Sequence, residues 1–162
     1  MENLKTIILD RIIEEVETQI KIAERGRLGA IEESKAHKGA MASRYDTFKE
    51  EAQYLAGGFN AQILELSQRL GALKSIRNYS PTITKGSGYA IIEAEKLEDG
   101  SRVKYFLLPA GGGNTYEVGD EKIIVLNVGA PMARAFMGAV ADDEVKIELQ
   151  GTMRIFRVIS VS

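Results

Sequence analysis

The fold is decided by the stretch Phe48-Lys-Glu-Glu-Ala-Gln-Tyr-Leu-Ala-Gly-Gly-Phe-Asn-Ala-Gln-Ile-Leu-Glu-Leu-Ser-Gln-Arg-Leu-Gly-Ala-Leu73. Apolar side chains recur in it every third or fourth residue, with charged or polar residues between them, which is the period of one face of an amphipathic helix. The pattern predicts a helix over 47–74, roughly 42 Å long at a rise of 1.5 Å per residue. The residues of the stripe are Phe48, Ala52, Leu55, Phe59, Ile63, Leu66, Leu70 and Leu73.

A second helical stripe precedes this one. Its apolar residues are Leu9, Ile12, Val16, Ile20 and Ala23, again in steps of three or four. A helix with a single apolar stripe is not stable alone in water, and the nearest partner for each helix is the other. The pattern therefore predicts an antiparallel coiled-coil hairpin within the chain. An intermolecular coiled coil is the alternative.

Glycines and small or charged residues weaken the apolar stripe between the two series. Gly26, Gly29 and Gly39 fall here, and we expect the tip of the hairpin at 37–47. The single histidine of the chain, His37, lies near this tip. A lone histidine without ligand partners at a suitable spacing is typical of a surface position.

Three acids stand beside the expected tip. Asp46 and Glu50 are four residues apart, so they share one face if both are helical, and Glu51 follows one step round the helix. Carboxylates so placed suit a hard divalent cation. The other interpretation is a solvated turn, in which acids near a helix start stabilise the helix dipole.

The pattern changes near Asn78. Beyond it the period shifts toward two, and five runs rich in β-branched and aromatic residues predict strands. Pro131 and Gly138 bracket a short predicted helix. The expected fold is α+β, with a helical hairpin over 1–78 and a small antiparallel sheet domain with a short helix over 79–162. The five runs are 88–95, 102–108, 122–128, 144–149 and 154–161.

Composition limits the function. The 162 residues carry a net charge of −2, and neither half is basic: 12 Lys or Arg stand against 12 Asp or Glu in 1–78, and 9 against 11 in 79–162. Binding to nucleic acid through a general positive field is therefore not expected. The chain has no cysteine, which excludes disulfides and thiolate sites. Neither a membrane span nor a signal peptide is predicted, so a cytoplasmic protein is expected.

Motifs for independent catalysis are missing. The glycine run at 110–114 lacks the Lys-Ser/Thr pair and the following helix of a phosphate-binding loop, so it predicts a mobile connection or a bulge. A Gly-x-Ser-x-Gly motif is absent, and the single histidine offers no triad. An enzyme that acts alone is not expected.

Two segments resemble the bacterial Gre transcript cleavage factors. Ala130-Pro-Met-Ala-Arg-Ala-Phe-Met-Gly138, followed by Asp142-Asp-Glu-Val, is similar to the family's Ser-Pro-Leu-Ala-Arg-Ala-Leu-Leu-Gly and Gly-Asp-x-Val. Ala130 replaces the usual serine and Asp142 the usual glycine. Lys49-Glu-Glu-Ala-Gln-Tyr54 is similar to the acidic motif at the family's hairpin tip. The matching C-terminal positions are Pro131, Ala133, Arg134, Ala135, Gly138, Asp143 and Val145.

The resemblance implies a specific activity. The C-terminal domain would have an FKBP-like fold and dock on bacterial RNA polymerase, while the hairpin enters the secondary channel. Asp46 and Glu50, with Glu51 as a third acid, would help the polymerase hold a second Mg²⁺ that promotes hydrolysis of backtracked RNA. The chain would meet the RNA 3′ end only within that complex, as a monomer, and would stimulate the polymerase's own cleavage rather than act as an enzyme.

The resemblance also implies a polymerase contact on the short helix, at Pro131, Met132, Arg134 and Phe136. For Phe136 a core position is the favoured alternative, because large aromatic side chains are usually buried, and Arg134 is the better candidate for an exposed contact.

One departure from the family's pattern stands at the tip. The family's acid pair is three residues apart, whereas here Lys49 takes that place and Glu50 follows it. The alternative function is therefore a regulator that binds the channel without stimulating cleavage.

Two further functions each require a specific feature of the chain. A peptidyl-prolyl isomerase, suggested by the FKBP-like fold, needs a concave aromatic pocket, but the few aromatics of this half lie mostly on predicted strands. A structural coiled-coil adaptor would form a concentration-dependent dimer.

Overall fold

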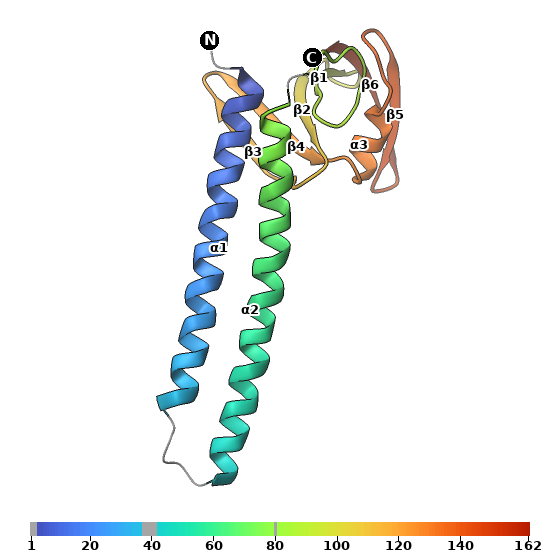
Figure 1. The fold of residues 1–162 in the computed structure, drawn as a ribbon. Coiled ribbons are helices and arrows are strands. Elements are labelled where there is room, and N and C mark those ends of the chain that lie inside the picture. Colours follow the sequence, from blue (N-terminus) through green and yellow to red (C-terminus); the bar gives the residue numbers. More distant parts are fainter. Residues whose placement is uncertain (1–2, 37–41, 80) are drawn as a thin grey trace. The chain divides into compact units, whose positions relative to one another are not determined.

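The computed structural model describes residues 3–36, 42–79 and 81–162 (Figure 1). The chain divides into two compact units, one of Arg11–Lys74 and the other of Met1–Asp10 with Ser75–Ser162. His37 and the first half of the expected hairpin tip lie outside the described residues. Within the described ranges, no helix combines the length and the apolar character needed to cross a membrane.

The predicted helical hairpin is confirmed. Helix α1 spans Leu4–Ala36 and helix α2 spans Ala42–Arg77, and Figure 1 shows them side by side. Their antiparallel register follows from contacts that join early α1 to late α2. The Glu17 carboxylate meets the Lys74 ammonium at 2.7 Å, and Arg27 Nη1 donates to Asn60 Oδ1 at 3.3 Å.

Helix α2 begins earlier than predicted. Its first residue is Ala42 rather than Thr47, so 42–47, expected in the tip, are helical. The apolar stripe begins at Phe48 and gives no signal for the polar turn before it. A helix can extend through such residues because serine and arginine tolerate helical backbone angles.

Gly26 leaves room for a large side chain on the facing helix. A Cβ at this position would lie 2.5 Å from the ring of Phe59 on α2. The absence of a side chain on α1 thus leaves room for a large one on α2. This glycine, which weakens the apolar stripe in the sequence, is part of the interface between the helices.

The other unit is built on a six-stranded sheet with the order β3-β4-β2-β1-β6-β5. Neighbouring strands are antiparallel except for one pair, β2 and β4. The predicted α+β class is confirmed. The strands are β1 (Ile91–Lys96), β2 (Arg102–Leu108), β3 (Thr115–Val118), β4 (Glu121–Asn127), β5 (Glu144–Leu149) and β6 (Thr152–Val161), and helix α3 (Pro131–Phe136) follows β4.

The predicted antiparallel sheet contains one parallel pair, so it is a mixed sheet. Strand β3 was not predicted, and it reverses the chain once more between β2 and β4, so that β4 runs parallel to β2. The reversal uses Gly111, Gly112 and Gly113, which all have positive φ. A Cβ on Gly112 would lie 2.5 Å from the backbone nitrogen of Asn127. The glycine run is therefore a tight connection beside β4.

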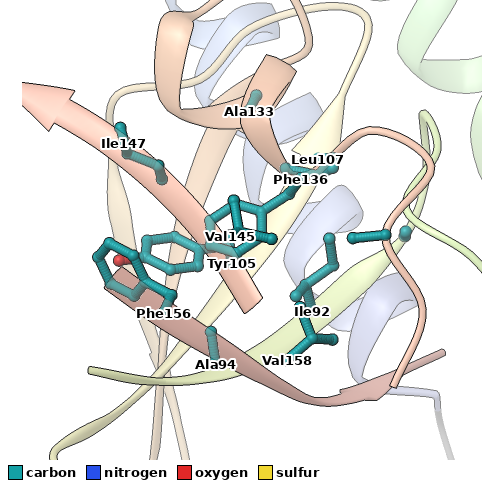
Figure 2. Close-up of a cluster of buried hydrophobic side chains, with 12 residues drawn as sticks. Ile92, Ala94, Tyr105, Leu107, Ala133, Phe136, Val145, Ile147, Phe156 and Val158 are labelled. Carbon is teal, nitrogen blue, oxygen red and sulfur yellow. The ribbon is translucent and has the colours of Figure 1, made fainter. Parts of the chain in front are cut away.

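The core of this unit lies between the sheet and α3, which packs against β4 and β5. Figure 2 shows the aromatic rings of Tyr105, Phe136 and Phe156 together in it, with centroids 5.4–6.3 Å apart. The buried residues of this cluster are Ala90, Ile92, Ala94, Tyr105, Leu107, Ala133, Phe136, Ala139, Val145, Ile147, Phe156 and Val158.

The first turns of α1 belong to the same unit. Ile8 and Leu9 are fully buried, and Lys5, 6% exposed, places its ammonium 4.8 Å from the ring centroid of Tyr89. Burial lowers the pKa of Lys5, and the cation–π contact offsets part of the cost of desolvating its charge. Tyr89 itself has a φ of 81°, in the left-handed region.

Candidate functional site

The first three turns of α2 carry the acids predicted at the tip. Asp46 and Glu50 are both helical and exposed, and their spacing of four places them on one face of α2. Within the described ranges, neither carboxylate forms a hydrogen bond or an ion pair. The structure thus brings these two predicted residues together on a solvent-facing surface.

Glu51 lies elsewhere on the helix. It is five residues beyond Asp46, which is more than a third of a turn away round the axis. Its side chain lines a hollow between α1 and α2, together with Glu33 of α1. The three predicted acids therefore form a pair and a separate third residue.

The donor set of the pair fits part of a magnesium site. Mg²⁺ prefers oxygen ligands and is commonly held by one or two carboxylates, with waters and phosphate oxygens completing the octahedron. Asp46 and Glu50 supply two such carboxylates. In the described part of the chain, no three acids or histidines are grouped for metal binding. The remaining ligands would have to come from elsewhere.

Helix α3 carries the residues predicted to contact a partner. Pro131 is exposed at the first turn, and Arg134 is exposed in the last turn, where its positive charge complements the helix dipole. Met132 is half-buried and packs against the core. Phe136 is fully buried, so its predicted partner contact is corrected: it has no surface to offer without unfolding the domain.

The motif around α3 is explained largely by the fold. Gly138, just past the helix, has a φ of 83°, and Asp142 has a φ of 73°, so both positions lie in the left-handed region that glycine adopts most readily. Asp143 accepts a hydrogen bond from the Val140 amide at 2.9 Å. The side chain of Arg134 has no comparable structural contact, because it forms no ion pair with any described residue.

Glu33 was missed by the sequence analysis. No signal in the sequence points to it, because it lines the same hollow as Glu51 only once the two helices are packed together. Once Glu17 is paired with Lys74 and Arg27 with Asn60, the antiparallel register places residues near 33 opposite those near 51.

Comparison with known proteins gives distant likenesses. No family model matches the chain, and no curated protein matches it. Solved structures similar to it include GreA factor homolog 1 (Gfh1) of Thermus thermophilus, with 17% identity, a TM-score of 0.37 and coverage of 97% of this chain and 94% of that one. Gfh1 of Thermus aquaticus gives 14% identity, a TM-score of 0.37 and coverage of 91% and 92%.

A further similar structure is the elongation factor GreA/GreB of Nitrosomonas europaea. Its identity is 14% and its TM-score 0.35, over 64% of this chain and 89% of that one. At TM-scores this low the likenesses carry no functional argument. The function of the chain has to be argued from its own residues.

Proposed function

We propose that this chain is a Gre-type transcription elongation factor. It binds bacterial RNA polymerase at the secondary channel and stimulates cleavage of backtracked RNA. The observation that carries the proposal is the pair Asp46 and Glu50, exposed on one face of α2, in a chain whose α3 segment resembles the family's C-terminal motif.

The hairpin acts by presenting carboxylates. Asp46 and Glu50 are exposed, so both can approach the polymerase active centre without rearrangement of α2. They would supply two carboxylates to a second Mg²⁺, and the polymerase and the RNA would have to supply the rest. When bound, this ion supplies an activated water and stabilises charge on the phosphate under attack.

The C-terminal unit provides the docking contact. Arg134 is exposed on α3 without a structural partner among the described residues, and Pro131 lies beside it on the same short helix. Arginine is favoured at protein interfaces because its guanidinium forms several directed hydrogen bonds. Docking would hold the hairpin in the channel while the acids act.

Release of short RNA fragments tests the proposal. The protein is added to a stalled, backtracked bacterial elongation complex with Mg²⁺, and the 3′ fragments are followed over time. Wild type is expected to accelerate their release, and Asp46→Asn or Glu50→Gln to abolish the acceleration. Glu65→Gln, an exposed acid further along α2, is the matched control and should behave as wild type.

The spacing of the acids favours a second candidate. Asp46 and Glu50 are four residues apart, whereas the acid pair of the Gre factors is three apart, and Lys49 stands where the second acid of that pair would be. Its ammonium, exposed beside the pair, would compete with Mg²⁺ for the carboxylates. A chain that binds the polymerase but releases no fragments would be a channel-binding regulator.

A further inference from the structure

The seam between the two helices changes character along the hairpin. Large side chains are buried at one end, such as Val16 on α1 and Leu66 on α2. Toward the tip the seam is lined by small residues, including Ala30 on α1 and Ala52 on α2. Small residues facing each other leave space that the helices do not fill.

That space is a hollow of about 180 Å³ between α1 and α2. Small-molecule sites are typically about 300–1,000 Å³, so this hollow is suited to one side chain rather than to a cofactor or a metabolite. Its apolar walls are Ala30, Phe48, Ala52 and Leu55. Phe48 and Leu55 keep 39% and 50% of their surface exposed, so a guest can reach them.

Two carboxylates stand at this hollow, Glu33 from α1 and Glu51 from α2. Both are exposed, and neither is paired with a described residue. The hydroxyl of Ser34, which also lines the hollow, donates to the Ile31 carbonyl at 2.8 Å. The open polar groups are therefore two negatively charged hydrogen-bond acceptors, one on each helix.

We propose that this hollow receives an arginine side chain of a protein partner. The aliphatic stem of an arginine would cover the apolar walls, as long basic side chains do elsewhere. Its planar guanidinium carries five N–H donors, enough to serve both Glu33 and Glu51. A lysine offers one compact charge and fits two separated acceptors less well.

The identity of the partner rests on the proposed function. If the hairpin enters the polymerase, the arginine belongs to a wall of the secondary channel. The hollow would then set how the hairpin is seated, while Asp46 and Glu50 act on the other side of the same turns of α2.

A peptide titration tests the hollow without the polymerase. The full chain, labelled for nuclear magnetic resonance, is titrated with a short peptide that carries one arginine between glycines. Shifts are expected at Ala30, Ala52 and Phe48, and weaker ones with the lysine peptide. The citrulline peptide keeps the shape but loses the charge, and it should give none.

Variants identify the charges. The double variant Glu33→Gln/Glu51→Gln is expected to bind the arginine peptide about tenfold more weakly, as the loss of charge-assisted hydrogen bonds requires. The matched control, Glu24→Gln/Glu65→Gln, changes one exposed acid on each helix away from the hollow and should bind as wild type. Absent shifts in wild type, or equal shifts with citrulline, would overturn the proposal.

Polymerase binding separates this inference from the function it builds on. Wild type is expected to bind the polymerase, and Glu33→Gln/Glu51→Gln to bind it at least about threefold more weakly, a modest share of an interface with several contacts. If neither wild type nor the double variant binds the polymerase, the proposed function is refuted, and the peptide titration still decides whether the hollow binds arginine. If wild type and the double variant bind the polymerase equally well, the proposal that a polymerase arginine enters the hollow is refuted.

Discussion

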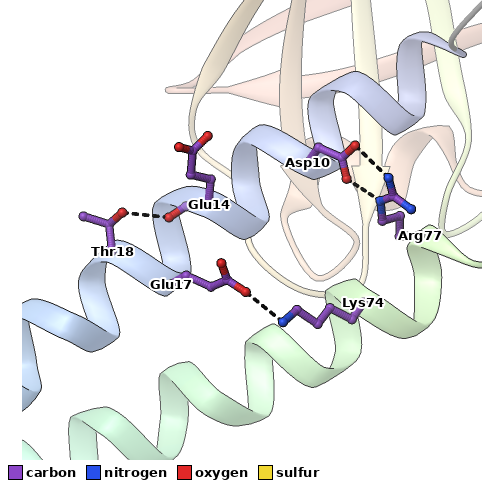
Figure 3. Close-up of polar contacts among 6 residues, drawn as sticks. All are labelled: Asp10, Glu14, Glu17, Thr18, Lys74 and Arg77. Carbon is purple, nitrogen blue, oxygen red and sulfur yellow. Dashed lines mark hydrogen bonds and ion pairs between the residues drawn. The ribbon is translucent and has the colours of Figure 1, made fainter.

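Arg77 forms a bidentate ion pair with Asp10 through two donors of its guanidinium. The Nε and Nη2 groups each donate to one carboxylate oxygen, and the Nη2–Oδ2 distance is 2.9 Å (Figure 3). This contact joins the start of α1 to the end of α2. The hydrogen bond from Arg77 lowers the pKa of Asp10 below its usual value of 3.8, and the charge of Arg77 acts in the same direction.

Loss of the Asp10–Arg77 ion pair should lower the free energy of unfolding, by an amount that depends on pH. Because the pKa of Asp10 is lower in the folded chain, the contribution is present above pH 3.8 and is lost as the pH falls through the folded value. Both side chains are about two-fifths exposed, so Asp10→Asn should cost no more than about 1 kcal/mol near neutral pH. Urea denaturation at neutral and acidic pH checks this. If the difference in unfolding free energy between wild type and Asp10→Asn grew toward acidic pH, Arg77 would not be stabilising the ionised form of Asp10.

Gly86 should tolerate no side chain. An added Cβ would lie 1.8 Å from the Phe136 carbonyl oxygen, and the Gly86 backbone is already bonded to Ala139 and Gly138 at 2.7 Å each. Since both neighbours are backbone and cannot rotate away, Gly86→Ala should cost at least about 1–3 kcal/mol of unfolding free energy.

Gly29 is the matched control for that substitution. It lies within α1, and a Cβ there meets nothing within 4 Å. Gly29→Ala should therefore raise the unfolding free energy by up to about 1 kcal/mol, through helix propensity. Thermal unfolding of the two variants should move in opposite directions. Equal effects would show that Gly86 is not held as the structure describes.

The sequence predicts elements that have a periodic pattern of apolar residues, and it does not predict pairings between segments far apart along the chain. The stripes that include Val16 and Leu66 predict the hairpin because helical periodicity is local. Strand β3 has four residues between glycine turns, too short for a periodic signal, and without it the parallel pairing of β2 with β4 is invisible.

The same limit applies to the candidate site. The placement of Asp46 and Glu50 on one face follows from helical geometry alone, and the structure agrees. The burial of Phe136 depends on Tyr105 and Phe156, which come from other strands. The placement of Glu33 and Glu51 at one hollow depends on the register of two helices. Such contacts are set by tertiary packing, which a single sequence does not display.

Tyr105 should make stability fall at alkaline pH. Burial raises its pKa to about 12 from an ordinary value of 10.0, so the folded chain keeps a proton that the unfolded chain loses. The contribution is complete below pH 10.0 and is lost as the pH rises toward about 12. Tyr105→Phe should flatten this decline in denaturation measured across that range. Tyr79→Phe, at an exposed position, should keep it, and an equal flattening would count against the burial of Tyr105.

Arg134 should carry binding energy for the polymerase and little for folding. Its side chain is exposed and forms no ion pair with a described residue, so Arg134→Glu should lower the unfolding temperature only slightly, through the lost contribution to the helix dipole. Polymerase affinity, measured by interferometry, should fall at least about tenfold, as expected for an arginine at the centre of an interface.

Lys122→Glu makes the same change of charge at an exposed position on β4, so it separates a direct contact from a loss of net positive charge. If both variants weaken binding equally, and the loss disappears at high salt, the effect is long-range electrostatics. If Arg134→Glu alone weakens binding, α3 is the docking element. If neither does, the polymerase contact predicted on α3 is refuted, because Phe136 and most of Met132 are withdrawn into the core and Pro131 has no charge or donor to replace Arg134.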